Sequence, residues 1–280
     1  MKTFAAPETV EEALAAVAAG GVPVAGGTDL VVAARSGRHP LPDALVSLHR
    51  VGALRGISFT ETGALALGAL VTHGEIERSE QMRGSWAALA DAAALVGSPA
   101  TRHVGTVGGN LANASPAMEL GSPLLVHDAR VEVNDGGRAL PVAELLAGPG
   151  KTTLRPGELI TRVVVPNPGP SAYMRLEYRR AMEIAVVGAA ALLVLDDRGR
   201  VTTARVALTA VAPTCVRAPS AEAALEHREP SEDVLAEAAG LAAEAASPIS
   251  DVRASERYRR AQIPVVVRRT LERALARARA

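Results

Sequence analysis

The sequence predicts an α+β protein in which a mixed α/β part is followed by a small sheet or hairpin covered by helices. Its length of 280 residues suggests two domains or lobes. Helix and strand patterns alternate up to residue 165, whereas two long apolar strands followed only by helices fill the end of the chain. The Pro- and Gly-rich residues 166–170 are the best linker candidate between these two parts.

Elements of the first part follow from capping and turn signals. Thr9 and Glu12 form a capping box that opens a helix reaching residue 19, where Gly20 ends it. Short apolar runs and turn residues predict the remaining strands and helices. In order, these are a strand at 22–25, a helix starting near Asp29, a strand at 44–48, a hairpin of 57–59 and 65–67, a second capping box at 72–75 and an Ala-rich helix at 86–96.

Beyond residue 96 the amino-acid composition changes. Residues 97–123 are rich in Gly, Ser, Asn and Pro and predict a long functional loop. A hairpin is expected at 131–133 and 138–140, and a strand at 159–165. The second part is expected to contain strands at 184–195 and 201–211 and helices at 221–226, 231–246 and 264–278. The Arg-rich residues 253–279 fit a solvated helix face or a surface that binds a partner.

Composition excludes several classes of protein. The 30 basic and 30 acidic residues cancel, which argues against a nucleic-acid binder. Cys215 is the single cysteine, so this chain has neither a disulfide framework nor ligands for an iron–sulfur cluster. The six histidines show no metal-ligand spacing, so no metal site is expected. No serine lies in a G-x-S-x-G nucleophile elbow, so a serine hydrolase is not supported. With no signal peptide and no membrane span, the chain is expected to be soluble and cytoplasmic.

Two glycine-rich segments could carry a ligand. Residues 24–30, Val-Ala-Gly-Gly-Thr-Asp-Leu, run from a strand into a helix. Such a turn lets the backbone approach an anion, although an ordinary tight turn has the same pattern. Residues 101–116 surround a second Gly-Gly pair with Thr106, Asn110 and Asn113, which would suit a diphosphate bound by backbone N–H groups. Neither segment has the spacing of a Rossmann or P-loop motif.

Together, these segments resemble the FAD-binding medium subunit of molybdenum hydroxylases of the carbon monoxide and xanthine dehydrogenase type. The supporting segments are 97–102, 155–160, 179–185 and 210–214, in the order of the family. The resemblance implies a two-subdomain FAD-binding fold of the vanillyl-alcohol oxidase type over residues 1–168. It also implies a small α+β flavoprotein domain over residues 169–280.

The same resemblance implies the residues of the cofactor site, and no catalytic residue in this chain. Residues 25–30 would surround the FAD diphosphate, with Thr28 donating a hydrogen bond. The second segment would supply Thr101, and would bind the diphosphate from the other side through Thr106, Gly109 and Asn110. Glu119 would reach sugar or ribityl hydroxyls, Ile160 would lie near the adenine or ring edge, and Arg175 would carry a positive charge to the flavin pyrimidine. The implied set from the first segment is Ala25, Gly26, Gly27, Thr28, Asp29 and Leu30. No histidine lies in this segment, so the FAD is expected to be non-covalent.

As a member of this family, the chain would be one subunit of a heterotrimer. A [2Fe–2S] small subunit would pass electrons to its FAD, and a molybdenum large subunit would oxidise the substrate. NAD, a quinone or another acceptor would take the electrons. Two alternatives remain: a self-contained FAD-dependent oxidoreductase of the same fold, and a non-catalytic protein that has lost its cofactor. The intact glycine pairs argue against the second alternative.

Overall fold

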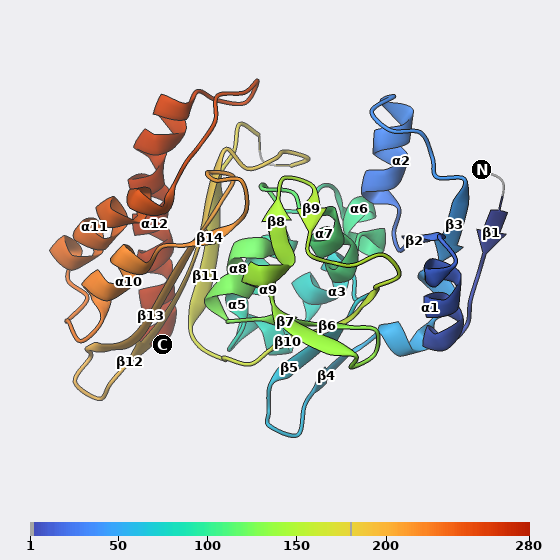
Figure 1. Cartoon of the computed structure of the whole chain (residues 1–280). Coiled ribbons are helices and arrows are strands. Elements are labelled where there is room, and N and C mark those ends of the chain that lie inside the picture. The colour runs from blue at the N-terminus through green and yellow to red at the C-terminus, as the bar shows by residue number, and fades with distance from the viewer. Residues whose placement is uncertain (1–2, 180) are drawn as a thin grey trace.

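The computed structural model describes residues 3–179 and 181–280, so Arg180 of the segment 179–185 lies outside the described residues. Figure 1 shows three β-sheet units side by side, from the blue N-terminal unit through a central sheet to the orange and red C-terminal unit. Within the described ranges, no helix is both long enough and apolar enough to cross a membrane.

The N-terminal unit is a small parallel sheet with its own apolar core. Its strands are ordered β1-β3-β2. Val10, Val17 and Val46 are among the residues of that core. Thr9 accepts a hydrogen bond from the Glu12 amide, but the Glu12 carboxylate accepts from the Glu8 amide, so only half of the predicted capping box forms. The elements are β1 (Thr3–Ala5), α1 (Val10–Ala18), β2 (Val22–Val24), α2 (Thr28–Arg35), β3 (Ala44–Ser47), η1 (Leu48–Arg50) and η2 (Gly52–Leu54).

The central unit is a five-stranded antiparallel sheet of order β4-β5-β10-β6-β7, and both predicted hairpins are confirmed in it. The predicted capping box at Thr72 and Glu75 is also confirmed. The strands are β4 (Ile57–Phe59), β5 (Leu65–Gly68), β6 (Arg130–Val133), β7 (Arg138–Pro141) and β10 (Ile160–Val165), with a separate hairpin of β8 (Leu146–Gly148) and β9 (Lys151–Thr152). The accompanying helices are α3 (His73–Arg78), α4 (Glu80–Arg83), α5 (Ala87–Ala93) and α9 (Val142–Leu145).

The expected long loop at 97–123 is wrong, because this segment forms three short helices. They are α6 (Pro99–Val104), α7 (Val107–Asn113) and α8 (Gly121–Val126). Ser98 caps α6 and Thr106 caps α7 through their hydroxyl groups. All six residues of α8 are buried. Burial and capping therefore stabilise helices that the local composition disfavours.

The C-terminal unit is a four-stranded antiparallel sheet whose own helices α10, α11 and α12 cover one of its faces. The hairpin of the two long predicted strands is confirmed, although its first strand begins at Val187 instead of residue 184. The last helix was expected from residue 264 but begins at Glu256, where Ser255 caps it, and it contains Pro264. The elements are β11 (Ser171–Leu176), β12 (Val187–Leu195), β13 (Val201–Thr209), β14 (Val216–Arg217), α10 (Pro219–Leu225), α11 (Glu232–Leu241), η3 (Ala242–Ala245) and α12 (Glu256–Ala278).

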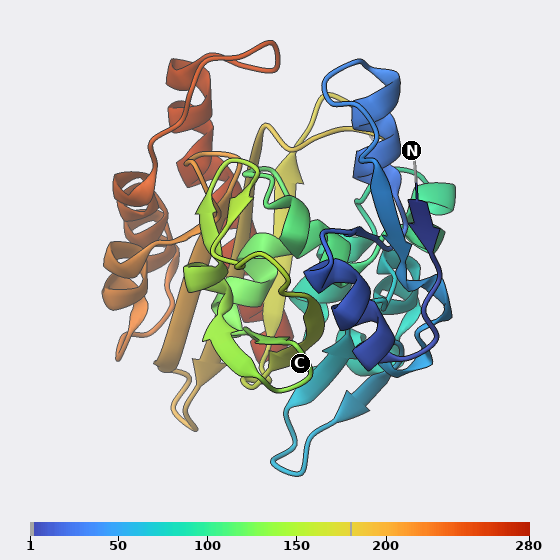
Figure 2. The ribbon, with the colours of Figure 1, turned by 45° about the vertical axis from the view of Figure 1, so that its right-hand side comes forward.

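The C-terminal sheet is buried on both faces, which explains the unbroken apolar run of β12. Successive side chains of a strand point to opposite faces. Ala189 and Leu193 belong to the core shared with α10, α11 and α12, whereas Ala190 and Leu192 belong to the core shared with α5 and α8. Figure 2 shows this sheet between the two groups of helices. The large core therefore extends from the central unit into the C-terminal unit.

The junction between the two parts is held by His127. Its Nδ1 donates to the Asn167 carbonyl at 2.6 Å, and its Nε2 accepts from the Ser171 hydroxyl at 3.1 Å. Residues 166–170 form neither helix nor strand. We propose the domain boundary between residues 168 and 169 of this segment. Burial lowers the pKa of His127 to about 4.

We expect His127→Gln to destabilise the protein at neutral pH, because a buried hydrogen-bonding group loses a partner at a cost of about 1–3 kcal/mol. The stabilisation from neutral His127 is present above its ordinary pKa of 6.5 and is lost as pH falls toward 4. Thermal unfolding at several pH values should therefore show that the difference in unfolding temperature between wild type and variant becomes smaller in acid. The exposed His39→Gln is the control, and a difference that becomes larger in acid would contradict this assignment.

Candidate functional site

The first glycine turn joins β2 to α2 and fits against another part of the chain. Gly27 has a φ of 67°, a left-handed conformation that glycine adopts without strain. A Cβ on Gly26 would overlap the carbonyl oxygen of Val104, at the end of α6. The backbone of this turn therefore lies directly on the second glycine segment, and only glycine permits that approach.

The second glycine segment is folded tightly onto the central sheet. The Thr106 hydroxyl accepts a hydrogen bond from the Gly109 amide at 3.1 Å. A Cβ on Gly108 would crowd Ala69, and one on Gly105 would crowd His73. Gly109 differs from these two, because the only atom near its Cβ position is the Thr106 hydroxyl oxygen, at 3.1 Å. The side of α7 at Gly109 is therefore open.

The two segments meet at a positively charged hollow of about 170 Å³. Ala25 and Gly26 line it from the first turn, and Thr106 lines it from the second segment. The remaining lining residues, all within the described chain, are His49, Arg55, Leu70, Thr72, His103 and Val104, and they include no carboxylate. Nearby, the Asn113 amide donates to the Asp29 carboxylate at 3.2 Å, which ties α7 to α2. Burial raises the pKa of Asp29.

This hollow fits the diphosphate part of FAD. Its ionisable lining groups are arginine and histidine. The helix α2 begins two residues after the lining residue Gly26, and its first-turn N–H groups have no side-chain cap. The Asn110 side-chain oxygen is buried without a partner among the described residues, so that amide can serve a ligand. The hollow is smaller than the pockets that enclose drug-sized ligands. It would therefore hold only the middle of an extended dinucleotide.

Glu119 and Arg175 come together in a second, buried group. The Glu119 carboxylate accepts from the Tyr173 hydroxyl and from the Arg175 guanidinium. Arg175 also donates to Glu177 at 2.5 Å. Glu119 follows α7 in the first part of the chain, whereas Tyr173 and Arg175 project from β11 of the C-terminal part. This group therefore links the two parts of the chain.

Two further expected site residues, Thr101 and Ile160, lie outside the hollow and outside the group around Glu119. Thr101 lies in α6, and its hydroxyl contacts the Ser98 hydroxyl at 3.1 Å. Ile160 is 4 % exposed and belongs to the large core, where it pairs with Val133 across β10 and β6. The structure therefore brings Ala25, Gly26 and Thr106 together, and Glu119 with Arg175, but keeps Ile160 within the sheet.

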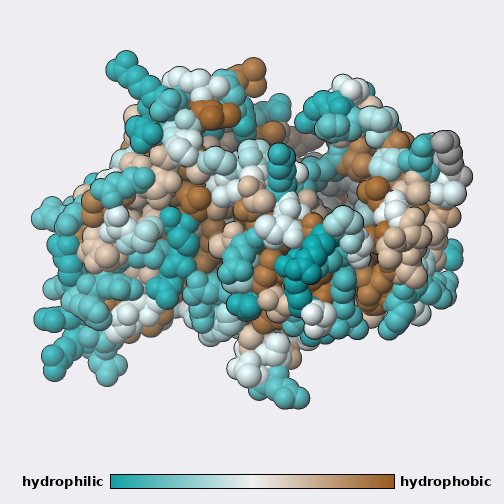
Figure 3. All heavy atoms as spheres, viewed as in Figure 1, coloured by the Kyte–Doolittle hydropathy of each residue, from teal (hydrophilic) through white to brown (hydrophobic). Residues whose placement is uncertain are grey.

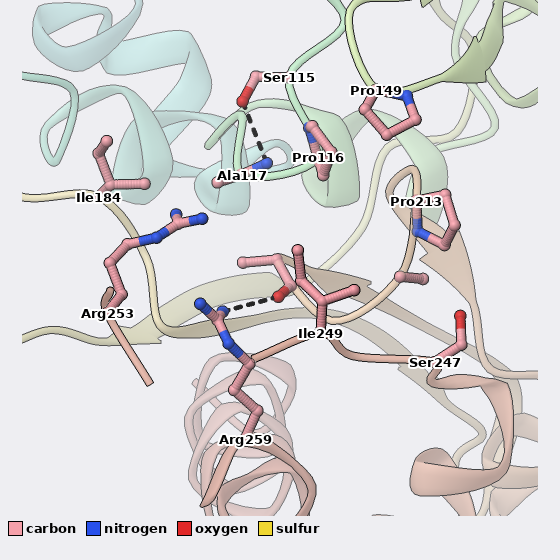
Figure 4. A pocket seen from close by; sticks show the side chains of 12 residues that line it. Ser115, Pro116, Ala117, Pro149, Ile184, Pro213, Ser247, Ile249, Arg253 and Arg259 are labelled. Carbon is pink, nitrogen blue, oxygen red and sulfur yellow. Dashed lines mark hydrogen bonds between the residues drawn. The ribbon is translucent and has the colours of Figure 1, made fainter. Parts of the chain in front are cut away.

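A larger cavity of about 270 Å³ lies where the two parts of the chain meet (Figure 4). Arg253 and Arg259 are its charged lining residues. The Arg259 side chain is 1 % exposed, and its Nε has no partner among the described residues. The other lining residues are Ser115, Pro116, Ala117, Pro149, Ile184, Ala210, Ala212, Pro213, Ser247 and Ile249. The sequence analysis singled out the segments 106–116, 179–185 and 210–214 and the Arg-rich end, all of which supply lining residues, but it did not predict this cavity.

The surface around these sites is indented and partly apolar. Figure 3 shows a notch at the top of the molecule, between α2 and the loops of the C-terminal unit. Val32 on α2 is 54 % exposed, and Met182 and Ile249 in the C-terminal loops are 59 % and 68 % exposed. No group of three metal-ligating side chains that could hold an ion occurs in the described parts of the chain.

Comparison with known proteins gives consistent matches over both parts. Residues 1–168 match the FAD binding domain in molybdopterin dehydrogenase, and residues 171–274 match the CO dehydrogenase flavoprotein C-terminal domain. The 6-hydroxypseudooxynicotine dehydrogenase complex subunit alpha of Paenarthrobacter nicotinovorans is 35 % identical, with 99 % of this chain and 95 % of that protein covered. The xanthine dehydrogenase FAD-binding subunit of Escherichia coli O157:H7 is 29 % identical, with 90 % and 88 % covered. The structure of reconstituted CO dehydrogenase from Oligotropha carboxidovorans superposes with a TM-score of 0.93 at 29 % identity, with 99 % of each chain covered.

The buried carboxyl of Glu119 should give the protein a distinctive pH dependence. Burial raises its pKa from 4.5 to about 7, although Arg175 and Tyr173 partly offset that rise. The folded state therefore holds this proton more tightly than the unfolded state, and stability is lost as pH rises through this window. We expect Glu119→Gln to remove this loss of stability. Between about pH 4.5 and 7, the unfolding temperature of wild type should therefore fall relative to that of the variant. Glu61→Gln, at an exposed turn, is the control. A relative decline of the variant instead would contradict the raised pKa.

Proposed function

This chain belongs to the family of FAD-binding subunits of molybdopterin dehydrogenases, and on that premise we propose that it relays electrons from an iron–sulfur subunit to a final acceptor. The observation that carries the proposal is the positively charged hollow shared by the two glycine segments. FAD, when bound, supplies the redox chemistry, since it can accept and release electrons. The chain itself contributes binding, orientation and charge.

Membership confirms the predicted family, fold class and oxidoreductase class, with FAD as the cofactor of this subunit. We propose that the molybdenum cofactor and the iron–sulfur clusters lie in partner subunits, since the single cysteine of this chain cannot hold a cluster. We propose a small [2Fe–2S] subunit and a large molybdenum subunit as the partners, in a heterotrimer. Non-covalent attachment of FAD remains a prediction, and it rests on the lack of histidine in residues 24–30.

We propose separate roles for the two groups of site residues. Residues 25–30, Thr106, Gly109 and Asn110 hold the diphosphate, because they surround the hollow or flank it. Glu119 and Arg175 face the sugar hydroxyls and the flavin pyrimidine. Thr101 supports the turn that precedes α7, through its contact with Ser98. The buried Ile160 supports the sheet beneath the adenine or ring edge.

We propose that the cavity in Figure 4 admits the electron acceptor. Ser115 and Pro116 line it directly after α7, so it lies close to the second glycine segment. Apolar walls would accept a planar ring, and the partly exposed guanidinium of Arg253, which also pairs with Asp251, would contact an anionic group. NAD combines these two features. On this proposal, the acceptor binds on the side of the C-terminal domain.

The lining of this cavity argues against a self-contained oxidoreductase. Such an enzyme needs an acid or base beside its substrate. Among the lining residues there is no histidine, carboxylate or lysine. Two guanidinium groups bind anions but do not exchange protons near neutral pH. The cavity is therefore better suited to an acceptor that takes electrons or hydride than to a substrate that requires proton transfer.

Gly109→Val tests the diphosphate site. Space is open beside Gly109 apart from the flexible Thr106 side chain, so the fold should tolerate valine, whereas the diphosphate should not. We expect the purified variant to lose most of its bound FAD and to keep its unfolding temperature within a few degrees. Gly240→Val is the matched control, because Gly240 is also helical and has no neighbour within 4 Å. Full FAD occupancy in Gly109→Val would show that the site lies elsewhere.

Ser247→Trp tests the acceptor cavity. The indole should fill the space in which an acceptor ring would lie. We expect reduction of the bound flavin by NADH to slow by about tenfold or more in rapid-mixing absorbance, equivalent to about 1.4 kcal/mol. Reduction by dithionite should be unchanged. Ser58→Trp, on the exposed strand β4, is the control. Equal NADH rates in Ser247→Trp and wild type would exclude this cavity as the entry site.

A further inference from the structure

Three basic side chains line the hollow that the two glycine segments share. Arg55 directly follows η2, His49 belongs to η1 and His103 belongs to α6. All three residues are exposed, so a ligand that enters the hollow can reach them. They are called the basic lining group below.

Arg55 is held in place by His49. One guanidinium nitrogen of Arg55 donates to the His49 carbonyl oxygen at 2.8 Å, and the same nitrogen lies 3.2 Å from His49 Nδ1. Arginine has no acceptor atom and keeps its protons in proteins, so Nδ1 must be the acceptor in this contact. In this geometry the ring of His49 is therefore neutral, with its proton on Nε2.

His103 is also held in its neutral form. Its Nδ1 lies 2.7 Å from the Pro99 carbonyl oxygen, which can only accept, so Nδ1 carries the proton. Its Nε2 lies 3.4 Å from a guanidinium nitrogen of Arg78, which can only donate. A second proton on either imidazole would therefore bring two positive charges together with no anion between them, which disfavours that proton.

The charged groups around the basic lining group have partners of their own. These pairs are Arg50 with Glu8, Arg102 with Glu77, the Glu75 carboxylate with the Thr72 hydroxyl, and the Asp29 carboxylate with the Asn113 amide. His73 lies against Gly105 beneath the hollow, and burial lowers its pKa to about 4, so it stays neutral above that pH. Among the lining residues, His49 and His103 are of the type that changes charge between about pH 5 and 8.

We propose that the basic lining group binds the cofactor diphosphate in a proton-linked manner, so that His49 and His103 each take up a proton as the anion enters. The inference rests on the proposed function, in which this hollow holds the diphosphate of FAD. Each proton comes from solvent and binds one ring nitrogen, Nδ1 of His49 or Nε2 of His103, and no bond of FAD changes. Affinity for FAD should therefore fall as pH rises, because the neutral imidazoles lack the charge that the anion favours.

Protonation also changes what Arg55 can do. Once Nδ1 of His49 carries a proton, it no longer accepts from Arg55, which then keeps only its hydrogen bond to the His49 carbonyl oxygen. The released guanidinium N–H groups and the new imidazolium N–H groups become donors for phosphate oxygens. Charge and hydrogen-bond donors are therefore gained together, and only in the presence of an anion that offsets the repulsion between the two cations.

The test titrates the full chain, depleted of FAD, with FAD at about pH 6 and at about pH 8. The diphosphate bridge of FAD is doubly negative and has no proton to exchange in this range. We expect binding to weaken at the higher pH by about fivefold for each imidazole. Calorimetric titration in two buffers of different ionisation enthalpy should show proton uptake on binding, up to one proton for each imidazole.

The double variant His49→Gln and His103→Gln tests the source of these protons. Glutamine keeps a hydrogen-bonding side chain but cannot gain a charge. We expect this variant to bind FAD with nearly the same affinity at both pH values and to lose most of the proton uptake. The matched control is the double variant His39→Gln and His227→Gln, because both residues are exposed and neither lines the hollow. It should behave as wild type.

Arg55→Met tests the permanent charge of the basic lining group. We expect FAD to bind about fivefold or more weakly at both pH values, whereas Arg55→Lys should recover part of this loss because it keeps the charge. Arg50→Met is the matched control, since Arg50 is an exposed arginine that pairs with Glu8 and does not line the hollow.

The outcomes separate this inference from the proposed function. If wild type binds FAD equally well at both pH values and takes up no proton, the proton-linked role is wrong while the FAD site stands. If the double variant of His49 and His103 keeps the pH dependence of wild type, the protons bind elsewhere and the role of these two residues is wrong. If the wild-type chain binds no FAD at either pH, the proposed function itself fails.

Discussion

The close contact between Gly26 and the carbonyl oxygen of Val104 is the constraint on which the proposed cofactor site depends. It brings a turn of the N-terminal unit onto the end of α6 in the central unit, with no side chain between them. That approach allows Asn113 to reach Asp29 and leaves a hollow lined by both glycine segments. The N-terminal unit has only a small core of its own, so its position relative to α7 relies on contacts of this kind.

The two groups of site residues differ in their charge. Around the hollow, arginine and histidine with no lining carboxylate create an environment for an anion. Behind α7, Glu119 and Glu177 compete for the single guanidinium of Arg175. Because β11 supplies Arg175 and Tyr173, the C-terminal part contributes the partners of Glu119, which belongs to the first part of the chain. The core that one face of β12 shares with α5 and α8 packs the C-terminal sheet onto the central unit.

The sequence predicted those features that depend on residues close together in the chain. Both glycine turns, the hairpins and the Thr72 capping box follow from residues close together in the chain. The helices α6, α7 and α8 could not be recognised, because capping by Ser98 and Thr106 and burial of α8 outweigh a composition that disfavours helix. In the candidate site, Arg175 was expected but its partners Tyr173 and Glu177 were not. Strand β11 directly follows the Pro-rich residues 166–170, and Glu119 lies more than fifty positions away from Arg175, so sequence proximity gives no indication of their contact.

Hydrogen–deuterium exchange of the chain with and without FAD tests the central claim most directly. Backbone amides of residues 26–30 and 106–110 should both become protected when FAD binds, because the proposed site has the diphosphate between the two segments. Amides of the distant helix α11 should exchange at the same rate in both states. Protection of only one segment, or of neither while FAD is bound elsewhere, would contradict a cofactor site shared by the two glycine segments.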